Sequence, residues 1–246
     1  MKVLIINGSP RANGNTSIAL KEMIKVFDAE GVETEVLQIG NKDIRSCIAC
    51  GKCAQTGACV FNDLVNETAP KFEACDGLVV ASPVYYASAN ATLVAFLTRL
   101  FYSTHFDKTM KVGASVVCAR RGGLSSTFDE LNKFFTISGM PVASSQYWNS
   151  IHGRAAGEAA QDAEGLQTMR TLARNMTFLM KSIALGKEAY GLPKREPLAR
   201  RDSARGGEVT RPPPNQGKRA GTRRIAVGFR RLLFRSFRLL MAQHLV

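Results

Sequence analysis

The segment NGSPRANGNTS, residues 7–17, combines glycines with hydroxyl, amide and guanidinium side chains. It follows the short, β-branched run KVLII, which is typical of a buried parallel strand, and from Thr16 onward apolar residues recur at helical spacing. Where a strand passes into a helix, free backbone N–H groups and the positive end of the helix dipole form an anion site. An ordinary helix N-cap would need one polar side chain, but this loop supplies six. We therefore predict a phosphate site with the candidate side chains Ser9, Arg11, Asn13, Asn15, Thr16 and Ser17.

Two well-known phosphate loops do not match this segment. In a P-loop a lysine follows the second glycine, but Gly8 and Gly14 are one residue too far apart and Asn15 stands in the lysine position. The dinucleotide-binding fingerprint G-x-G-x-x-G is broken at Pro10. The loop therefore favours a single terminal phosphate that no metal accompanies.

A second chemically distinctive segment, CIACGKCAQTGAC, carries cysteines at the spacing C-x2-C-x2-C-x5-C, namely Cys47, Cys50, Cys53 and Cys59. Four thiols this close, in a chain that we expect in a reducing cytoplasm, indicate metal binding before disulfides. Three cysteines at C-x2-C-x2-C with a fourth nearby are typical of [4Fe–4S] ligands, whereas zinc ligands come more often as two separated pairs. The spacing predicts a [4Fe–4S] cluster, with zinc and unmetallated thiols as the alternatives. Cys75 and Cys118 lie outside the motif and are expected to be buried.

A tyrosine pair follows the third predicted strand, in the segment SPVYYAS. Pro83 and Val84 precede the pair, and the proline stiffens the turn. Tyr85 and Tyr86 can lay an aromatic face against a planar ligand. The alternative is that either tyrosine packs on the next helix.

The segment ARRGG follows the fourth predicted strand. Gly122 and Gly123 allow close approach of the backbone, while Arg120 and Arg121 suit an anion such as the phosphate of a second substrate. A solvated charged turn is the alternative.

The elements that must position these loops alternate between strand and helix. We expect strands at 2–6, 33–39, 77–81, 111–118 and 141–148, and helices at 16–29, 63–73, 90–102, 125–137 and 163–185. This alternation predicts an α/β fold with a parallel sheet covered by helices on both faces. Ligands of such folds bind beyond the carboxyl ends of the strands, where the three loops are expected to meet.

Composition separates a body from a tail. Residues 198–246 hold 12 of the 33 Lys and Arg residues but 2 of the 20 Asp and Glu residues, so most of the net charge of +13 belongs to the tail. The basic balance therefore does not assign nucleic-acid binding to the body. No apolar run reaches the ~18 residues of a membrane span, and the first residues lack a leader-type apolar region, so we expect a cytoplasmic location.

The tail divides into two parts. Up to about Thr222 it is rich in Pro, Gly and Arg, as disordered linkers are. Beyond that point Phe229, Leu233 and Phe237 fall on one side of a helical wheel with arginines opposite, a pattern that can bind an anionic membrane or nucleic acid. The abrupt break favours a frameshifted or read-through extension without selected function, and we do not expect the tail to bind either partner.

The loops GSPRANGNTS, SPVYYAS and ARRGG, in this order on this strand pattern, resemble the flavodoxin-like NAD(P)H-dependent FMN reductases, and the cysteine spacing resembles that of iron–sulfur flavoproteins. The resemblance covers residues 1–197 and implies a doubly wound, five-stranded sheet with strand order 2-1-3-4-5. After the tyrosine loop relatives often read L-K-x-F-x-D-R. Here Val94 and Thr98 replace the two charges, which puts in question any surface pairing or subunit contact that they support.

The resemblance implies a cofactor and a reaction. FMN would bind through its phosphate to Ser9, Arg11, Asn15, Thr16 and Ser17, with Pro83, Val84, Tyr85 and Tyr86 beside its ring and Arg120, Gly122 and Gly123 as a third flavin-side loop. Hydride would pass from NAD(P)H to the flavin and on to a small-molecule or protein acceptor, with the cluster as a further carrier and no catalytic side chain required. The alternative is an electron carrier that a ferredoxin-like partner reduces. A homodimer or homotetramer is also implied.

Overall fold

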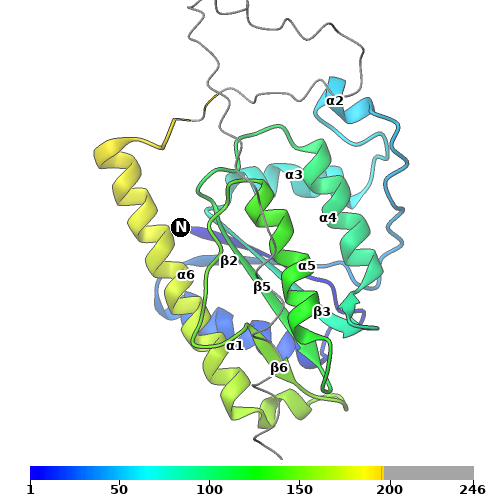
Figure 1. The fold of residues 1–246 in the computed structure, drawn as a ribbon, viewed down its shortest axis with the longest axis vertical. Coiled ribbons are helices and arrows are strands. Elements are labelled where there is room, and N and C mark those ends of the chain that lie inside the picture. The colour runs from blue at the N-terminus through cyan, green and yellow to red at the C-terminus, as the bar shows by residue number, and fades with distance from the viewer. Residues whose placement is uncertain (195, 197–246) are drawn as a thin grey trace, which may run out of the picture. The chain divides into compact units, whose positions relative to one another are not determined.

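Five parallel strands form the centre of the structure, a computed structural model that describes residues 1–194 and 196 (Figure 1). They are β1 (Lys2–Asn7), β2 (Glu33–Gln38), β3 (Gly77–Tyr85), β5 (Val112–Ala119) and β6 (Ser150–His152). They lie in the order β2-β1-β3-β5-β6, and every one of these neighbours pairs in parallel. The two-residue β4 (Ser88–Ala89) pairs antiparallel with the end of β3. With β4 set aside, the order is the predicted 2-1-3-4-5.

Helices cover both faces of this sheet, as predicted (Figure 1). Successive residues of a strand point to opposite faces, so Ile5 belongs to one apolar cluster and Ile6 to the other. The first cluster packs α1 (Asn15–Ala29) and α6 (Ala163–Tyr190) on the sheet, and the second packs α3 (Leu64–Ala74), α4 (Ala91–Ser103) and α5 (Leu124–Ile137). Both faces are thus buried, which explains why the central strands read as continuous apolar runs.

The predicted fifth strand, 141–148, is wrong in its position. The chain touches the sheet first at Val142, which forms an isolated bridge with Gly113, and pairs again at β6. Between these points Ser145 Oγ bonds to Asn149 Oδ1 at 2.7 Å and to the Tyr147 carbonyl at 2.6 Å. Such local side-chain bonds compete with strand pairing, so residues 144–149 form a loop.

Other boundaries differ in detail. β3 continues past the predicted 77–81 because its last residues pair with β5 and β4, and α6 extends beyond the predicted end at 185. The short α2 (Lys52–Thr56) and a 3-10 helix at Glu158–Gln161 were not predicted.

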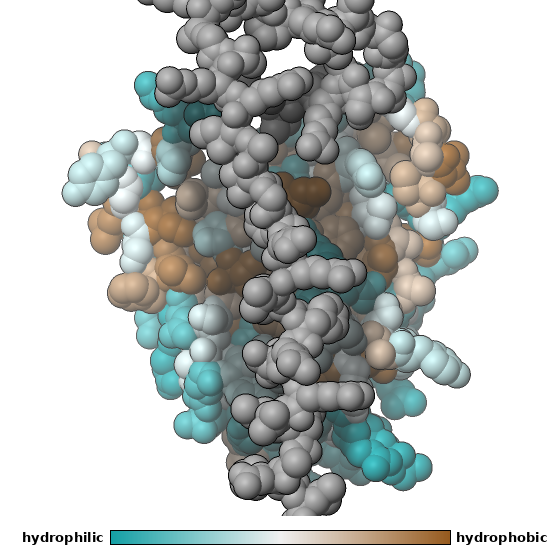
Figure 2. All heavy atoms as spheres, viewed as in Figure 1, coloured by the Kyte–Doolittle hydropathy of each residue, from teal (hydrophilic) through white to brown (hydrophobic). Residues whose placement is uncertain are grey.

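On the face seen in Figure 2, hydrophobic residues gather along the flank that α6 occupies in Figure 1. Phe178 and Leu185 of α6 are exposed.

The predicted tail, with its linker and amphipathic helix, lies outside the described residues. Within residues 1–194, no helix is both long enough and apolar enough to cross a bilayer.

Candidate functional site

The buried Asn7, at the end of β1, holds the loop that leads into α1. Its Oδ1 accepts a hydrogen bond from the Ser9 N–H at 3.0 Å. Its Nδ2 donates to Ser17 Oγ at 3.0 Å and to Gln38 Oε1 at 2.8 Å. The Gly8 N–H donates to a β3 carbonyl at 2.8 Å. The loop backbone is therefore fixed against both neighbouring strands before any ligand binds.

Several side chains predicted to bind phosphate are engaged within the protein instead. Ser9 Oγ accepts from the Arg11 N–H at 3.2 Å, and Ser17 Oγ donates to the Ala12 carbonyl at 2.5 Å. Ser9, Thr16 and Ser17 are all buried. The hydroxyls of Ser9 and Ser17 thus shape the loop.

The Asn15 side chain lies against a distant segment, which corrects its predicted role. Its Oδ1 accepts from the N–H groups of Gly157 and Ala159 at 3.1 and 3.2 Å, and its Nδ2 donates to the Ala155 carbonyl at 2.8 Å. An amide offers a donor and an acceptor together, so it can satisfy a stretch of loop backbone. This side chain is therefore not free for a phosphate.

Backbone N–H groups and one guanidinium remain available to an anion. The 15-residue α1 begins after Gly14, which has no side chain to cap it. Within residues 1–194, the N–H groups of Asn15 and Thr16 donate to no acceptor, and the exposed Arg11 guanidinium has no partner. A helix N-terminus in this state is an anion site. At the predicted phosphate location the donors left without a partner are thus mainly backbone groups.

The two tyrosines lie on a tight hairpin between β3 and β4. Tyr86 and Ala87 have φ values of 50° and 59°, although neither is a glycine, and they connect the paired Tyr85 and Ser88. Positive φ at both central residues is the geometry of a type I′ turn, and non-glycine residues adopt it at a cost. Tyr85 is 47% exposed and Tyr86 is fully exposed. Neither ring is packed away on the next helix, and Pro83 lies within β3 rather than in the turn.

The loop after β5 touches this hairpin. A Cβ at Gly123 would lie 2.7 Å from the Ala87 Cα, so the two backbones meet at the closest approach that a glycine permits. Ser126 Oγ donates to the Ala87 carbonyl at 2.8 Å. Glu130 of α5 accepts from the Ser88 hydroxyl and the Ala89 N–H, both at 2.8 Å. The second and third predicted loops therefore form one surface, on which Arg120 and Gly122 are exposed.

Asn90 joins the first and second loops, and our sequence reasoning missed it. Its Nδ2 donates to the Gly8 carbonyl at 2.8 Å, its N–H donates to Ser82 Oγ at 2.9 Å, and its Oδ1 caps α4 at the Thr92 N–H. The signal was present, because an asparagine before an apolar helical run is a preferred N-cap. Its long-range bond had no sequence signal.

The four cysteines line one small cavity of about 30 Å³. Cys47 and Cys50 are exposed, while Cys53 on α2 and Cys59 are partly buried. Ala49, Gly51 and Gly57 all have positive φ, so the segment turns repeatedly between its thiols. In the part of the chain described, no three His, Cys, Asp or Glu side chains surround a point that a single ion would occupy. The four sulfurs thus lie around one cavity but do not converge on the position of a single ion.

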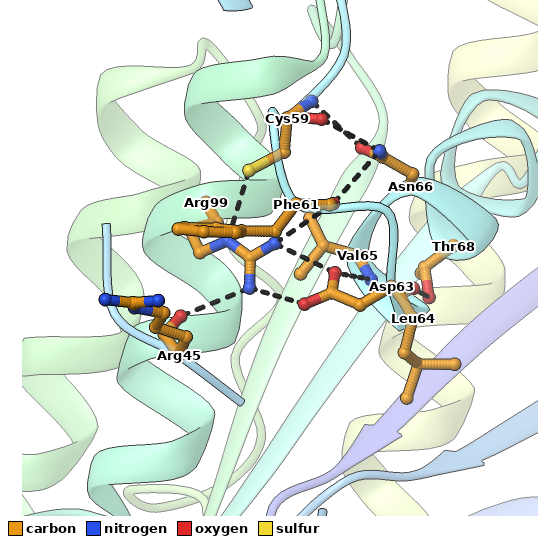
Figure 3. A network of polar contacts seen from close by, with 9 residues as sticks. All are labelled: Arg45, Cys59, Phe61, Asp63, Leu64, Val65, Asn66, Thr68 and Arg99. Carbon is orange, nitrogen blue, oxygen red and sulfur yellow. Dashed lines mark hydrogen bonds and ion pairs between the residues drawn. The ribbon is translucent and has the colours of Figure 1, made fainter. Parts of the chain in front are cut away.

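Arg99 of α4 contacts the last of these thiols. It is 1% exposed, and its Nε donates to Cys59 Sγ at 3.2 Å (Figure 3). Asp63 accepts from Nη1 and Nη2 at 2.8 Å each and also caps α3 at the Val65 N–H. Burial lowers the pKa of Arg99, but the hydrogen bonds to Asp63 and Cys59 outweigh it and raise that pKa overall. The guanidinium therefore stays charged beside the cysteine segment.

Comparisons with known proteins identify the family of the chain. Residues 1–155 match the family model described as NADPH-dependent FMN reductase. The chain is 33% identical over 191 residues to an iron-sulfur flavoprotein of Methanocaldococcus jannaschii, covering 74% of this chain and 99% of that protein. It is 31% identical over 192 residues to an iron-sulfur flavoprotein of Methanosarcina thermophila, covering 76% and 100%.

A solved flavodoxin from the domain Archaea superposes with a TM-score of 0.50 at 14% identity, over 74% of this chain and 99% of the flavodoxin. This likeness supports the predicted flavodoxin-like fold. Because the family model spans more than half of the sequence, the chain belongs to the NADPH-dependent FMN reductase family and is an FMN reductase-like oxidoreductase.

Proposed function

We propose that this protein binds FMN at the carboxyl edge of its sheet, takes hydride from NAD(P)H and passes electrons to an acceptor through a [4Fe–4S] cluster. The observation that carries the proposal is the free N-terminus of α1 on the same edge as an exposed tyrosine hairpin. A ligand with a phosphate at one end and a flat ring at the other matches these two features. FMN has this form.

The phosphate end would be held by the N–H groups of Asn15 and Thr16 and by the Arg11 guanidinium. Ser9 and Ser17 would support them by keeping the loop in shape. In this arrangement backbone N–H groups would supply most of the binding energy for the phosphate. An Arg11 substitution should therefore weaken FMN binding without abolishing it.

The ring end would lie beside Pro83, Val84, Tyr85 and Tyr86, with Arg120, Gly122 and Gly123 on the adjoining loop. When bound, FMN supplies the group that accepts hydride and releases electrons singly or in pairs. The chain contributes an aromatic face, backbone donors at the ring edge and the exclusion of competing reactants. No side-chain acid or base is required, and none is assigned.

The cluster would be held by Cys47, Cys50, Cys53 and Cys59. Four thiols are the ligand set of a [4Fe–4S] cluster. Each thiolate binds a different iron, so the sulfurs need not converge on one point as they do around zinc. The four thiols line one cavity, so the donor set at this place fits a cluster of that type.

One experiment tests both cofactors. The protein is purified without oxygen, and its absorption spectrum, flavin, iron and sulfide are measured on one sample. Flavin bands above a broad shoulder, with about four irons and four sulfides per chain, would support the proposal. Flavin without iron would refute the proposed cluster, and the absence of both chromophores would refute the proposed cofactor chemistry as a whole.

A matched pair of ligands tests the phosphate site. Riboflavin has the ring of FMN but no phosphate, so it should bind more weakly to the wild type. Arg11→Gln should reduce the affinity for FMN and leave that for riboflavin unchanged, as measured by fluorescence quenching. Equal losses for both ligands would place the phosphate elsewhere.

A second candidate function is an electron carrier that a ferredoxin-like protein reduces without direct reaction with NAD(P)H. The exposure of Cys47 and Cys50 favours it, since a protein donor can approach a cluster held there. Anaerobic mixing decides between the two. Rapid bleaching of the flavin by NADH or NADPH supports the reductase, and bleaching by reduced ferredoxin alone supports the carrier.

We also propose that the protein acts as a homodimer or homotetramer. The fully exposed Tyr86 leaves one side of the ring site open to water, and a neighbouring subunit would cover it. Light scattering of the FMN-loaded protein should give two or four chains per particle. A monomeric mass would reject this assembly.

A further inference from the structure

Arg99 is the bulkiest of the fully buried side chains in residues 1–194. Removing a guanidinium from water is costly unless its donors find acceptors and its charge finds a partner. The charge is matched by Asp63, which binds both terminal nitrogens. The remaining contacts show what else the buried group does.

The guanidinium makes as many hydrogen bonds as it has N–H groups. Besides the two bonds to Asp63, Nη1 donates to the Arg45 carbonyl at 3.1 Å and Nη2 to the Phe61 carbonyl at 3.4 Å. The fifth bond runs from Nε to Cys59 Sγ at 3.2 Å. A planar, five-donor group has a fixed geometry once its other donors are bound. Cys59 Sγ therefore contacts a guanidinium whose own position is fixed by its other bonds.

The backbone of Cys59 is held as well. Its N–H donates to Asn66 Oδ1 and its carbonyl accepts from Asn66 Nδ2, both at 2.9 Å. Figure 3 shows the cysteine between Asn66 of α3 and Arg99 of α4. Cys47 and Cys50, by contrast, are exposed on a segment without regular structure. One thiol of the four is thus fixed by the core of the protein.

We propose that Arg99 is a positioning residue for the iron–sulfur cluster: its Nε–H···Sγ bond to Cys59 fixes the fourth ligand and raises the reduction potential of the cluster. This inference rests on the proposed function, in which the four cysteines hold a cluster. Reduction adds one electron to the cluster and breaks no bond at Cys59. A donor to the ligating sulfur stabilises the added negative charge, and hydrogen bonds to the sulfurs are one of the known determinants of cluster potential.

Two variants distinguish the effect of this hydrogen bond on the cluster potential from the effect of a nearby positive charge. Arg99→Lys keeps a positive charge near Asp63 but lacks the Nε–H group that donates to Cys59 Sγ. Arg45→Gln removes a positive charge that lies over the same Phe61 ring, 5.2 Å from its centroid, and leaves the Arg99 bond intact. The cluster potential is measured by a redox titration followed by electron paramagnetic resonance, with the FMN potential in the same sample as the reference.

The proposal expects a more negative cluster potential in Arg99→Lys, an unchanged FMN potential and little change of either in Arg45→Gln. Equal cluster potentials in Arg99→Lys and the wild type would overturn the role of Arg99 while leaving the cluster in place. If the wild-type protein contained no iron, both the proposed cluster and the proposed role of Arg99 would be refuted. The failure of the Arg99 proposal alone and the failure of the proposed function are therefore distinguishable.

A measurement on the wild type covers the case in which Arg99→Lys does not fold. Protein labelled with ¹⁵N in arginine should show, in pulsed paramagnetic resonance of the reduced cluster, a coupling to a nitrogen that is one hydrogen bond from a ligating sulfur. No such coupling would overturn the proposal. Among the described residues, Arg99 is the arginine that donates a hydrogen bond to a cysteine sulfur, so a coupling to arginine nitrogen would be assigned to Arg99.

Discussion

Asn90 donates a hydrogen bond from Nδ2 to the Gly8 carbonyl at 2.8 Å, across 82 residues of sequence. The bond ties the loop after β1 to the start of α4, and the same side chain caps that helix. One buried amide therefore sets the spacing of the proposed phosphate and ring subsites. Its removal should affect stability and flavin affinity in separable ways.

Asn90→Ala should lower the free energy of unfolding by roughly 1–3 kcal/mol, because it removes a helix cap and leaves a buried carbonyl unpaired. Asn90→Ser is the matched control, since a serine hydroxyl can cap the helix but is too short to reach Gly8. Urea titration should show only the helix-cap part of the stability restored in Asn90→Ser, because the Gly8 carbonyl stays unpaired, and FMN affinity should stay reduced. Full recovery of affinity would show that the bridge to Gly8 does not position the ligand.

Gly123→Ala should be destabilising. The residue has a φ of +84°, and an added Cβ would lie 2.7 Å from the Ala87 Cα. We expect a loss of about 1–3 kcal/mol and weaker FMN binding because the tyrosine hairpin is pushed away. Gly122→Ala is the control, since a Cβ there meets no atom within 4 Å. Similar thermal midpoints for the two variants would contradict this account.

Asp162 should make folding sensitive to acid. Burial raises the pKa of its carboxyl group, but hydrogen bonds from the Gly165 N–H, the His152 N–H and the His152 ring outweigh this and hold the pKa below its usual 3.8. A lowered native pKa stabilises the fold above the unfolded-state pKa, and this contribution disappears as pH falls through the native value.

Asp162→Asn should therefore be less stable than the wild type at pH 7, by roughly 1 kcal/mol, because the amide keeps the helix cap but loses the negative charge at the start of α6. The difference should shrink progressively below about pH 4. Denaturant titrations of both proteins at several pH values give the measurement. A gap that stays constant down to pH 2 would assign the loss to packing instead of charge.

Cys75 and Cys118 should resist alkylation in the native protein. Burial raises the pKa of each thiol to about 11, so about one molecule in a thousand is thiolate at pH 8. Mass spectrometry after brief iodoacetamide treatment should find both unmodified, and both labelled once the protein is unfolded in urea. Native labelling of either residue would show that its region opens.

Local chemistry in the sequence was enough for the alternation of strands and helices and for the helix layers on both faces, whereas the strand order was implied by the family resemblance. Strongly apolar strands and a polar strand-to-helix turn each carry their own signal. The burial of Cys75 and Cys118 was also predicted correctly. The fifth strand was misplaced because residues 141–148 have strand-like composition, while Ser145 forms local bonds that no periodicity reveals.

Side-chain roles that depend on distant partners were harder to predict from the sequence. Asn15 reads as a phosphate ligand in its own loop, but its amide binds backbone groups near residue 157. No role was predicted from the sequence for Arg99, whose burial depends on its pairing with Asp63, 36 residues earlier. Such pairings arise from tertiary packing, which a single sequence does not display.

The position of Arg99 on α4 limits which insertions and deletions the chain can tolerate. Asn90 caps α4, and Arg99 lies nine positions later on that helix. Adding one residue between them would rotate Arg99 by about 100° around the helix axis. The guanidinium would then leave Asp63 and Cys59. Extra residues between Cys53 and Cys59, at a turn where Gly57 already adopts positive φ, would leave that alignment unchanged. Length changes are therefore expected to be accepted in the turn and rejected in the helix.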